Sequence, residues 1–404
     1  MAALRLNRAM NQRAGFESNL LVQEKLVNEP NVFGLDETYL QKKMAFARFV
    51  GERLAFLPYE KDKSVRFAFS PARFGADVSQ HPLLQNADLI HLHWTQFGYL
   101  SLSSLKKIFD LQKPVFCTLH DQWTFTGGCH YSGGCERYEA ACGQCKFLKR
   151  PSEGDLSARI FEQKRRLFAN LAPSALTLVS PSAWLGNMAQ KAELTKKFGL
   201  HVVPNPIDTS VFVPIDKRAA RQKLGLPTDK KLVLFGSANT TDPRKGFAYF
   251  EAAIAALGPE MADVEVVLFG KTGPILHLKT PVRTLGLLTE AQIMYAYAAA
   301  DVMVVPSLED NFPNTVAESM ACGTPVVGFE TGGVPEQIAH LQDGYVAQLK
   351  DTNDLKRGIE WVLTNPNYEQ MRQRGVQKIG ATMRNQVVAQ TLGDCYLKAT
   401  ELQP

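Results

Sequence analysis

Two carboxylate residues give this sequence its clearest candidate for chemistry. Asp310 and Glu318 are separated by seven residues, within a segment (306–327) that reads as strand end, loop, helix, glycine stop and strand. Pro313 suits the first turn of that helix, and Gly323 suits the position just after its end. Ligands of open parallel sheets bind beyond the carboxyl ends of strands, and helix N-terminal N–H groups favour phosphate. The segment is therefore expected to meet a phosphate-bearing ligand.

A cysteine cluster is the second candidate site. Four of the seven cysteines lie between residues 129 and 145, with five, six and two residues between successive members. Four thiolates at this spacing suit a closed, structural zinc site that fixes a loop poor in core residues. Reduced thiols, a disulfide pair or an iron–sulfur cluster are alternatives, and His130 is an alternative ligand. The predicted ligands are Cys129, Cys135, Cys142 and Cys145.

The elements that must position these residues follow from the apolar runs. Short apolar runs alternate with helical patterns, which is typical of parallel sheets covered on both faces. We therefore predict an α/β protein of two Rossmann-like, doubly wound domains that face each other across a cleft, with a proline-rich hinge at 204–208. The predicted strands are 87–92, 114–119, 176–179 and 200–203 in one sheet, and 231–236, 264–269, 301–305 and 324–328 in the other.

The N-terminal segment departs from that pattern. Residues 2–10 are amphipathic at helical spacing, and residues 16–22 read as a strand. A doubly wound domain usually starts with a strand and a glycine-rich turn, so we expect that the first N-terminal strand is missing. A domain that simply begins with a helix is the alternative.

The segment around the two carboxylates resembles the Glu-x7-Glu signature of retaining glycosyltransferases of the GT-B fold, family 4 (group 1). Asp310 takes the place of the first glutamate, which contacts the donor sugar in that family, and Glu318 matches the second, which holds the ribose hydroxyls. Both roles need an ionised acceptor for O–H donors. The shorter Asp310 is a departure, similar to a variant in polysaccharide-assembly members. The alternative is a turn-forming aspartate and a solvated helix glutamate.

The resemblance extends to the segment 235–246. Lys245 matches a family lysine that grips the donor pyrophosphate, where cations stabilise the charge that develops on the leaving diphosphate. The arginine of the family motif would fall near Ser237 and is absent, and Arg244 is adjacent in sequence. A solvated turn is the alternative. The other residues that the resemblance assigns to donor binding are Asn311, Phe312, Asn314, Thr315, Leu285, Gly332 and Gly333.

Histidines and tryptophans close two strands of the N-terminal half. His120 matches a family histidine that sits against the donor sugar, whereas His91 and His93 carry no such match. Trp94 and Trp123 offer flat faces for a sugar ring, with burial in the core as the alternative. The His-Asp-x-Trp stretch that leads into the cysteine-rich loop resembles glycosyltransferases of colanic-acid-type exopolysaccharide assembly.

The resemblance implies that the two domains have different functions. Residues 1–204 would form the acceptor-side domain with the cysteine-rich loop 127–146, residues 205–383 the nucleotide-sugar-binding domain, and residues 384–404 a helix that crosses back. The implied activity is retaining sugar transfer from a nucleotide diphosphate sugar to a glycan or lipid-linked acceptor in cell-surface polysaccharide biosynthesis, with no metal or other cofactor in the chemical step. A non-catalytic nucleotide-sugar-binding or scaffold protein and a nucleotide-sugar epimerase of the same fold are the alternatives.

Composition limits the partners. The 404 residues include 45 Lys+Arg and 40 Asp+Glu, and a net charge of +5 is too mild for a dedicated nucleic-acid binder. We see neither a transmembrane segment nor a signal peptide, so we expect a cytoplasmic protein. Basic and aromatic residues interleave over 41–74, which favours peripheral contact with anionic lipid on the inner face of the membrane. A solvated helix with an apolar stripe is an equal alternative.

Overall fold

The computed structural model describes residues 1–271, 273 and 278–401. It divides into two compact units, of which unit 1 comprises Met1–Val203 and Ala389–Pro404, and unit 2 comprises Pro204–Val388. Each unit contains a parallel sheet with helices packed against it, so the prediction of an α/β protein with two Rossmann-like domains is confirmed. Among the described residues, no helix is both long and apolar enough to cross a membrane.

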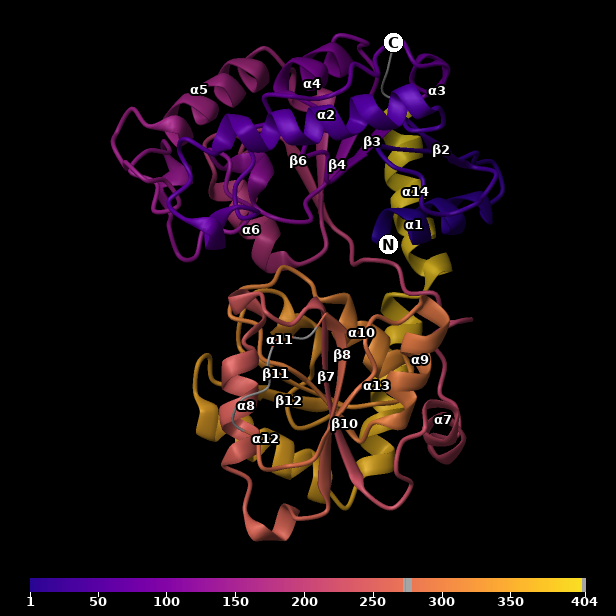
Figure 1. Cartoon of the computed structure of the whole chain (residues 1–404). Coiled ribbons are helices and arrows are strands. Elements are labelled where there is room, and N and C mark those ends of the chain that lie inside the picture. The colour runs from indigo at the N-terminus through magenta and orange to yellow at the C-terminus, as the bar shows by residue number, and fades with distance from the viewer. Residues whose placement is uncertain (272, 274–277, 402–404) are drawn as a thin grey trace. The chain divides into compact units, whose positions relative to one another are not determined.

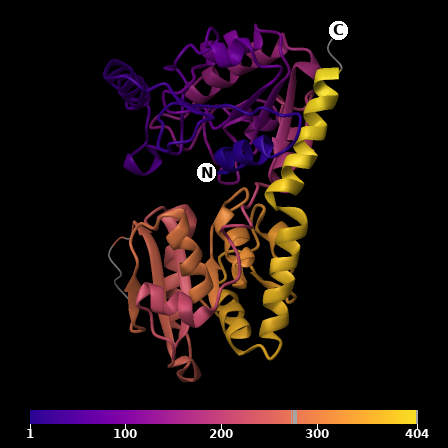
Figure 2. The same ribbon diagram turned by 90° about the vertical axis from the view of Figure 1, so that its right-hand side faces the viewer.

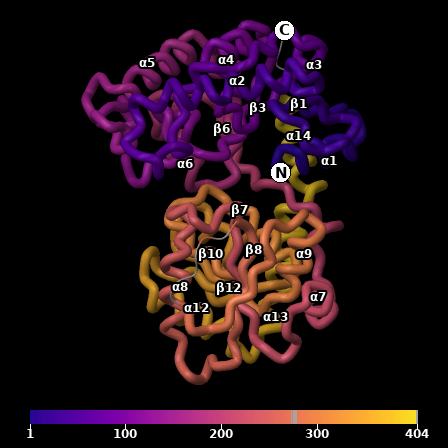
Figure 3. The backbone as a smooth tube through the Cα atoms, viewed as in Figure 1, coloured from indigo at the N-terminus to yellow at the C-terminus, as the bar shows by residue number. Residues whose placement is uncertain are grey.

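Unit 2 is built on a six-stranded sheet. Its order is β12-β11-β10-β7-β8-β9, and every neighbouring pair is parallel. The tube in Figure 3 shows β7, β8 and β10 gathered in the middle of this unit. The strands are β7 (Lys231–Asn239), β8 (Val264–Lys271), β9 (Val282–Thr284), β10 (Val302–Val305), β11 (Val326–Phe329) and β12 (Gly344–Ala347).

Alternate side chains of these strands feed two separate cores. Leu232 and Leu234 of β7 join one apolar cluster, whereas Val233 and Phe235 join another, because successive side chains of a strand point to opposite faces. Figure 1 shows α8 and α12 on one side of the sheet and α9, α10 and α13 on the other. The helices are α7 (Lys217–Leu224), α8 (Phe247–Ala255), α9 (Glu290–Ala299), α10 (Asn314–Ala321), α11 (Val334–Gln337), α12 (Thr352–Thr364) and α13 (Tyr368–Thr382), with 3₁₀ turns η5 (Pro243–Lys245) and η6 (Pro259–Met261).

Unit 1 carries a four-stranded parallel sheet and a separate two-stranded one. The larger sheet has the order β3-β4-β5-β6, and β1 pairs with β2. The strands are β1 (Leu20–Val22), β2 (Val32–Gly34), β3 (Ile90–His93), β4 (Val115–Thr118), β5 (Leu176–Ser180) and β6 (Gly199–Val202). The helices are α1 (Ala2–Asn11), α2 (Tyr39–Phe56), α3 (Pro82–Gln85), α4 (Leu102–Phe109), α5 (Leu156–Ala169) and α6 (Ala183–Lys191), with 3₁₀ turns η1 (Lys63–Val65), η2 (Trp123–Phe125), η3 (Arg137–Glu139) and η4 (Pro173–Ala175).

The last helix, α14 (Asn385–Glu401), supplies side chains to unit 1. The Tyr396 hydroxyl lies 2.6 Å from Nδ1 of His91, and its ring lies 4.8 Å from that of Phe116 on β4. Arg13 donates to the carbonyl oxygens of Ala389 and Gln390, at 3.0 and 2.7 Å. Figure 2 shows the end of this helix, in yellow, beside the strands of unit 1. The C-terminal residues are thus part of the packing of unit 1.

Comparison with the sequence predictions shows where they were incomplete. All eight predicted core strands are present, and α1 confirms the predicted N-terminal helix. The strand predicted over 16–22 is wrong in extent, because only Leu20–Val22 pairs, with Val32–Gly34. Pro313 is the N-cap of α10 and not a residue of its first turn, whereas Gly323 follows the helix with φ +77° as predicted.

Candidate functional site

Three loops of unit 2 meet at the carboxyl edge of its sheet. They follow β7, β10 and β11, which are neighbours in the sheet, so their ends share one edge. The N–H of Leu308 donates to the Arg244 carbonyl at 2.8 Å, which joins the first two loops. The N–H of Gly333 donates to the Asp310 carbonyl at 3.2 Å, which joins the second and third. Predicted site residues that lie far apart in sequence are thereby brought together.

Two glycines allow these loops to approach so closely. A Cβ added to Gly246, which has φ +70°, would lie 1.8 Å from the Pro306 carbonyl oxygen. A Cβ added to Gly332, which has φ +55°, would lie 1.7 Å from the Asp310 carbonyl oxygen. Any side chain here would clash with backbone and would require a left-handed conformation that only glycine adopts readily.

An ion pair forms the centre of this site. Nζ of Lys245 donates to Oδ2 of Asp310 at 2.6 Å, and Asp310 is buried, with 6% of its surface exposed. The Ser307 hydroxyl donates to the same oxygen at 3.4 Å. The Lys245 side chain is 26% exposed, so its ammonium is partly open to a ligand. A partly exposed lysine beside a buried carboxylate can bind an anion and a hydroxyl group next to each other.

Arg244 approaches the same carboxylate. Its Nη1 lies 3.7 Å from Oδ2 of Asp310 and donates to the Glu309 carbonyl at 3.0 Å. Its Nη2 donates to Asp242 at 3.2 Å, so the guanidinium is held in place. Both adjacent cations therefore face Asp310. Ser237, where the family motif has arginine, is buried, and its hydroxyl has no hydrogen-bond partner within the described residues.

Glu318 is an anchored, buried side chain. It lies on α10, is 7% exposed, and accepts a hydrogen bond from the hydroxyl of Tyr297 at 2.8 Å. Tyr297 lies on α9 and is completely buried in the apolar core to which α10 also contributes. The alternative of a solvated helix glutamate is therefore wrong. Whether Glu318 turns to the same ligand as Lys245 and Asp310 stays a prediction.

The other predicted donor residues lie around this edge in different settings. Asn311 and Phe312 are buried, and Thr315 and Leu285 are half-buried. Phe312 packs in the apolar core, which gives it a structural role. Asn314 Oδ1 accepts a hydrogen bond from Asn205 Nδ2 at 3.1 Å, a partner from the predicted hinge that sequence reasoning missed. Asn205 lies between Pro204 and Pro206. These two prolines were the sequence signal that the backbone at Asn205 is restricted.

In unit 1 the predicted histidine belongs to a buried imidazole cluster. His120 Nε2 lies 3.0 Å from His93 Nδ1, and His91 Nε2 lies 2.8 Å from the Thr118 hydroxyl. Burial lowers the pKa of His120 to about 4 and that of His91 to about 3, and it lowers the pKa of His93 as well. These imidazoles are therefore neutral at pH 7, and His120 can donate or accept a hydrogen bond without carrying a charge.

This cluster predicts acid sensitivity. The histidine pKa values are depressed in the folded state, so the unfolded chain takes up protons first as the pH falls below about 6.5. Stability is present in full above that pH and is lost toward pH 4, by up to about 1.4 kcal/mol per pH unit for each histidine. Urea unfolding of the whole protein between pH 7.5 and 5 measures this slope. His93→Asn is expected to reduce the slope, whereas replacing the exposed His201 by Gln leaves it unchanged; equal slopes in both variants would refute the assignment.

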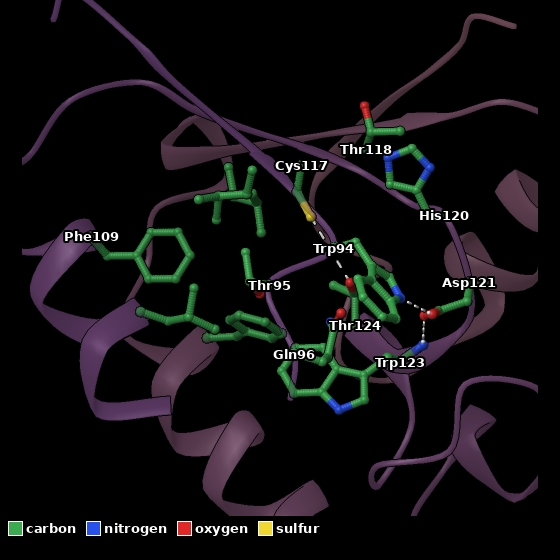
Figure 4. Close-up of a pocket in the computed structure, with 14 residues that line it drawn as sticks. Trp94, Thr95, Gln96, Phe109, Cys117, Thr118, His120, Asp121, Trp123 and Thr124 are labelled. Atoms are coloured by element: carbon green, nitrogen blue, oxygen red, sulfur yellow. Dashed lines mark hydrogen bonds between the residues drawn. The ribbon is translucent and has the colours of Figure 1, made fainter. Parts of the chain in front are cut away.

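Trp94 and Trp123 take different roles around Asp121 (Figure 4). Trp94 is 52% exposed, has φ +42°, and its indole N–H donates to Asp121 Oδ2 at 3.0 Å. Trp123 is 4% exposed and donates to the Ser70 carbonyl, so it belongs to the core. Burial alone would raise the pKa of Asp121, but the charge and hydrogen bond of His130 and the N–H donors of Trp123 and Trp94 lower it. The ionised carboxylate of Asp121 therefore fixes the position of the exposed Trp94 through the indole N–H.

The four predicted metal ligands lie around one small cavity. Cys129, Cys135, Cys142 and Cys145 all line it, and all are free thiols, so the disulfide alternative is not formed. Burial raises the pKa of Cys142 to about 12 and that of Cys145 to about 11. As positioned, no three His, Cys, Asp or Glu side chains in residues 1–271, 273 and 278–401 are arranged to hold a metal ion.

Part of unit 2 is similar to a known protein family. Residues 216–378, which carry Lys245, Asp310 and Glu318, match the family described as "Glycosyl transferases group 1". The chain is 30% identical over 205 residues to D-inositol 3-phosphate glycosyltransferase 2 of Catenulispora acidiphila, covering 45% of this chain and 48% of that protein. It is 28% identical over 242 residues to the MMP alpha-(1->4)-mannosyltransferase of Mycolicibacterium hassiacum, covering 56% and 53%. The chain thus spans about half the length of these relatives.

Solved structures share the fold over more of the chain. Sucrose-phosphate synthase from Thermosynechococcus elongatus superposes with a TM-score of 0.67 at 19% identity, covering 99% of this chain and 93% of that one. Anabaena HepE in complex with UDP-glucose gives a TM-score of 0.57 at 18% identity, covering 80% and 81%. At these identities the likeness shows the fold alone. One of these curated relatives is named as a D-inositol 3-phosphate glycosyltransferase and the other as a mannosyltransferase, so they lend no support to the colanic-acid-type resemblance.

Proposed function

We propose that this protein is a glycosyltransferase whose donor is a nucleotide diphosphate sugar bound by unit 2. The observation that carries the proposal is the Lys245–Asp310 pair, at 2.6 Å, on loops that close the carboxyl edge of a parallel sheet. The family match over 216–378 supports the same reading, as does the complex of the structural neighbour HepE with UDP-glucose. The curated relatives are named as glycosyltransferases and a mannosyltransferase.

The proposed mechanism uses the charges at this edge. Lys245 and Arg244 supply positive charge beside Asp310, where the developing negative charge of a leaving diphosphate would be stabilised. Asp310 then accepts a hydrogen bond from a sugar hydroxyl, and Glu318 accepts from the ribose. Transfer proceeds on one face: the bond from the anomeric carbon to phosphate breaks, the bond to the acceptor oxygen forms, and the departing phosphate takes the acceptor proton. The anomeric configuration is retained. In this mechanism Lys245 and Arg244, rather than a metal ion, stabilise the negative charge of the leaving diphosphate.

Donor screening tests this proposal directly. A ligand that binds only the folded state raises its stability, so one of the UDP-, GDP- or ADP-sugars is expected to raise the melting temperature. Release of free nucleoside diphosphate from that donor then demonstrates turnover, and product NMR reports the anomeric configuration. Binding without release favours the scaffold alternative. A changed sugar that is still attached to its nucleotide favours the epimerase, and either result overturns the proposal.

The acceptor side of the proposal concerns the membrane. We place the protein in the cytoplasm, at the inner face of the membrane, with a glycan or lipid-linked acceptor of cell-surface polysaccharide synthesis. Helix α2 supports the membrane contact, because much of this helix is exposed and carries both apolar and basic side chains. The exposed residues include Tyr39, Leu40, Met44, Phe46, Lys42 and Lys43.

Vesicle flotation checks this membrane contact. The protein is expected to float with vesicles that contain anionic lipid and to remain at the bottom with zwitterionic ones, because Lys42 and Lys43 are attracted to negative headgroups. Lys42→Glu with Lys43→Glu should abolish flotation, whereas the same change at Lys223, on α7 of unit 2, should not. Equal flotation of both variants would contradict the proposed surface.

A further inference from the structure

A buried lysine stands beside the cysteine cluster of unit 1. Lys164 lies on α5 and has no exposed surface. Its ammonium donates to the carbonyl oxygens of Trp123 and, at 3.0 Å, of Thr126, and it lies 3.4 Å from the centre of the Trp123 ring. Across the described residues, no carboxylate forms an ion pair with it. A fully buried charge of this kind needs a counter-charge nearby.

The cysteines are the neighbours that could supply this counter-charge. Thr126, whose carbonyl accepts from Lys164, lines the same cavity as all four thiols. Burial lowers the pKa of Lys164 to about 7, and ionised sulfur atoms of Cys142 and Cys129 would oppose this shift more than any other neighbour. Asp121 contributes less, and its carboxylate is already engaged by His130 at 2.6 Å. Neutral thiols cannot balance a cation, but metal-bound thiolates can.

Hydrogen-bond donors lie beside two of the sulfur atoms and oppose the rise in thiol pKa that burial causes. The N–H of Gly127 donates to Sγ of Cys142 at 3.2 Å. The backbone N–H of Phe147, two residues beyond Cys145, interacts with the Cys145 sulfur, as does the Ser157 hydroxyl. The Cys145 N–H donates to Asp155 Oδ2 at 2.8 Å, and Asp155 also caps α5, which ties the cysteine loop to the helix that carries Lys164. Donors aimed at sulfur stabilise its ionised form and orient it for a metal.

We propose that Cys129, Cys135, Cys142 and Cys145 bind one Zn²⁺, and that Lys164 is the buried counter-charge of the site. Binding releases four thiol protons to solvent and leaves a zinc tetrathiolate of charge −2, which the ammonium half neutralises. The ion has to draw the sulfur atoms together, since they are not gathered around one point in the structure. Cys135, Cys142 and Cys145 lie outside helices and strands, where side chains and backbone can adjust.

The site would fix the residues around Trp94. His130 directly follows Cys129, and its Nδ1 donates to Asp121, which in turn holds the Trp94 indole. A metal bound to Cys129 would therefore restrain His130, Asp121 and Trp94, which contact one another in that order. The ion is structural, because four protein ligands leave no open coordination position.

Elemental analysis tests the proposal on the intact protein. After zinc loading and dialysis against EDTA, we expect one zinc per chain, and Co²⁺ substitution should give the thiolate-to-cobalt absorption of a tetrahedral sulfur site. Cys142→Ser and Cys145→Ser should lose the metal, whereas Cys395→Ser, on α14, should keep it. Protein that holds no zinc after this loading overturns the proposal. Iron with inorganic sulfide also overturns it.

Two lysine variants test the counter-charge. Lys164→Met removes the charge at similar length and is expected to weaken zinc binding roughly 10–100-fold in chelator competition. Lys164→Arg keeps the charge and should bind more tightly than Lys164→Met. Equal affinity of Lys164→Met and the wild type would refute the role of Lys164. The wild-type metal content does not depend on whether these variants fold, and none of these results bears on donor turnover by unit 2.

Discussion

Replacement of Lys245 by alanine is expected to lower kcat for sugar transfer by about 10²–10³-fold, since a preorganised cation at the leaving group stabilises charge that appears only in the transition state. The same variant leaves the Asp310 carboxylate, which is 6% exposed, without its 2.6 Å partner. Removal of one member of a buried ion pair also destabilises the fold, so thermal unfolding has to be measured beside kcat.

Companion variants separate catalysis from folding. Lys245→Ala combined with Asp310→Asn removes both charges, so it should recover stability without recovering activity. Lys223→Ala, at the end of α7, is the matched control and should change neither quantity. A Lys245→Ala enzyme with wild-type kcat at saturating donor would remove Lys245 from the mechanism.

Replacement of Gly332 by alanine is expected to abolish most transfer activity. The new Cβ would lie 1.7 Å from the Asp310 carbonyl oxygen, so the loop that carries Asp310 must move. A displacement of about 1 Å at a catalytic group costs on the order of 100-fold in rate. Kinetics with the donor identified by thermal shift provide the measurement.

Gly225 offers a matched control for this change. It has φ +64°, close to the +55° of Gly332, but an added Cβ would meet nothing within 4 Å. Both alanine variants therefore incur the left-handed backbone cost of about 1–2 kcal/mol, and only Gly332→Ala adds the clash. Activity that falls equally in the two variants, or in neither, would show that close packing against Asp310 is irrelevant to function.

The sheet of unit 2 could be predicted from sequence because its strands are buried on both faces. Every residue of Val302–Val305 and of Val326–Phe329 is buried. Both strands can therefore be recognised in the sequence as short, continuous, uncharged and mostly apolar runs. The strand Val282–Thr284 was missed, because it is short, at the sheet edge and largely exposed. The strand Gly344–Ala347, at the other edge, was missed as well.

The candidate site could be predicted only in part. Lys245 and Asp310 were placed at strand ends by the topology, and their contact across 65 residues follows from the neighbouring positions of β7 and β10. The contact of His91 with Tyr396, across 305 residues, has no such basis, since no local pattern indicates where a C-terminal helix packs. The cleft that we expected between two domains, and the binding roles of the other donor residues, stay predictions.

The packing of α14 has a practical consequence for anyone who wants to dissect this protein. A fragment that stops at Val203 would lack Tyr396, whose hydroxyl meets His91 and whose ring covers Phe116, and it would strip Arg13 of its carbonyl acceptors. Such a fragment should expose apolar surface and aggregate. Expression of unit 1 by itself therefore calls for a circular permutant, or for the terminal peptide supplied in trans, and an affinity tag is better kept away from that end.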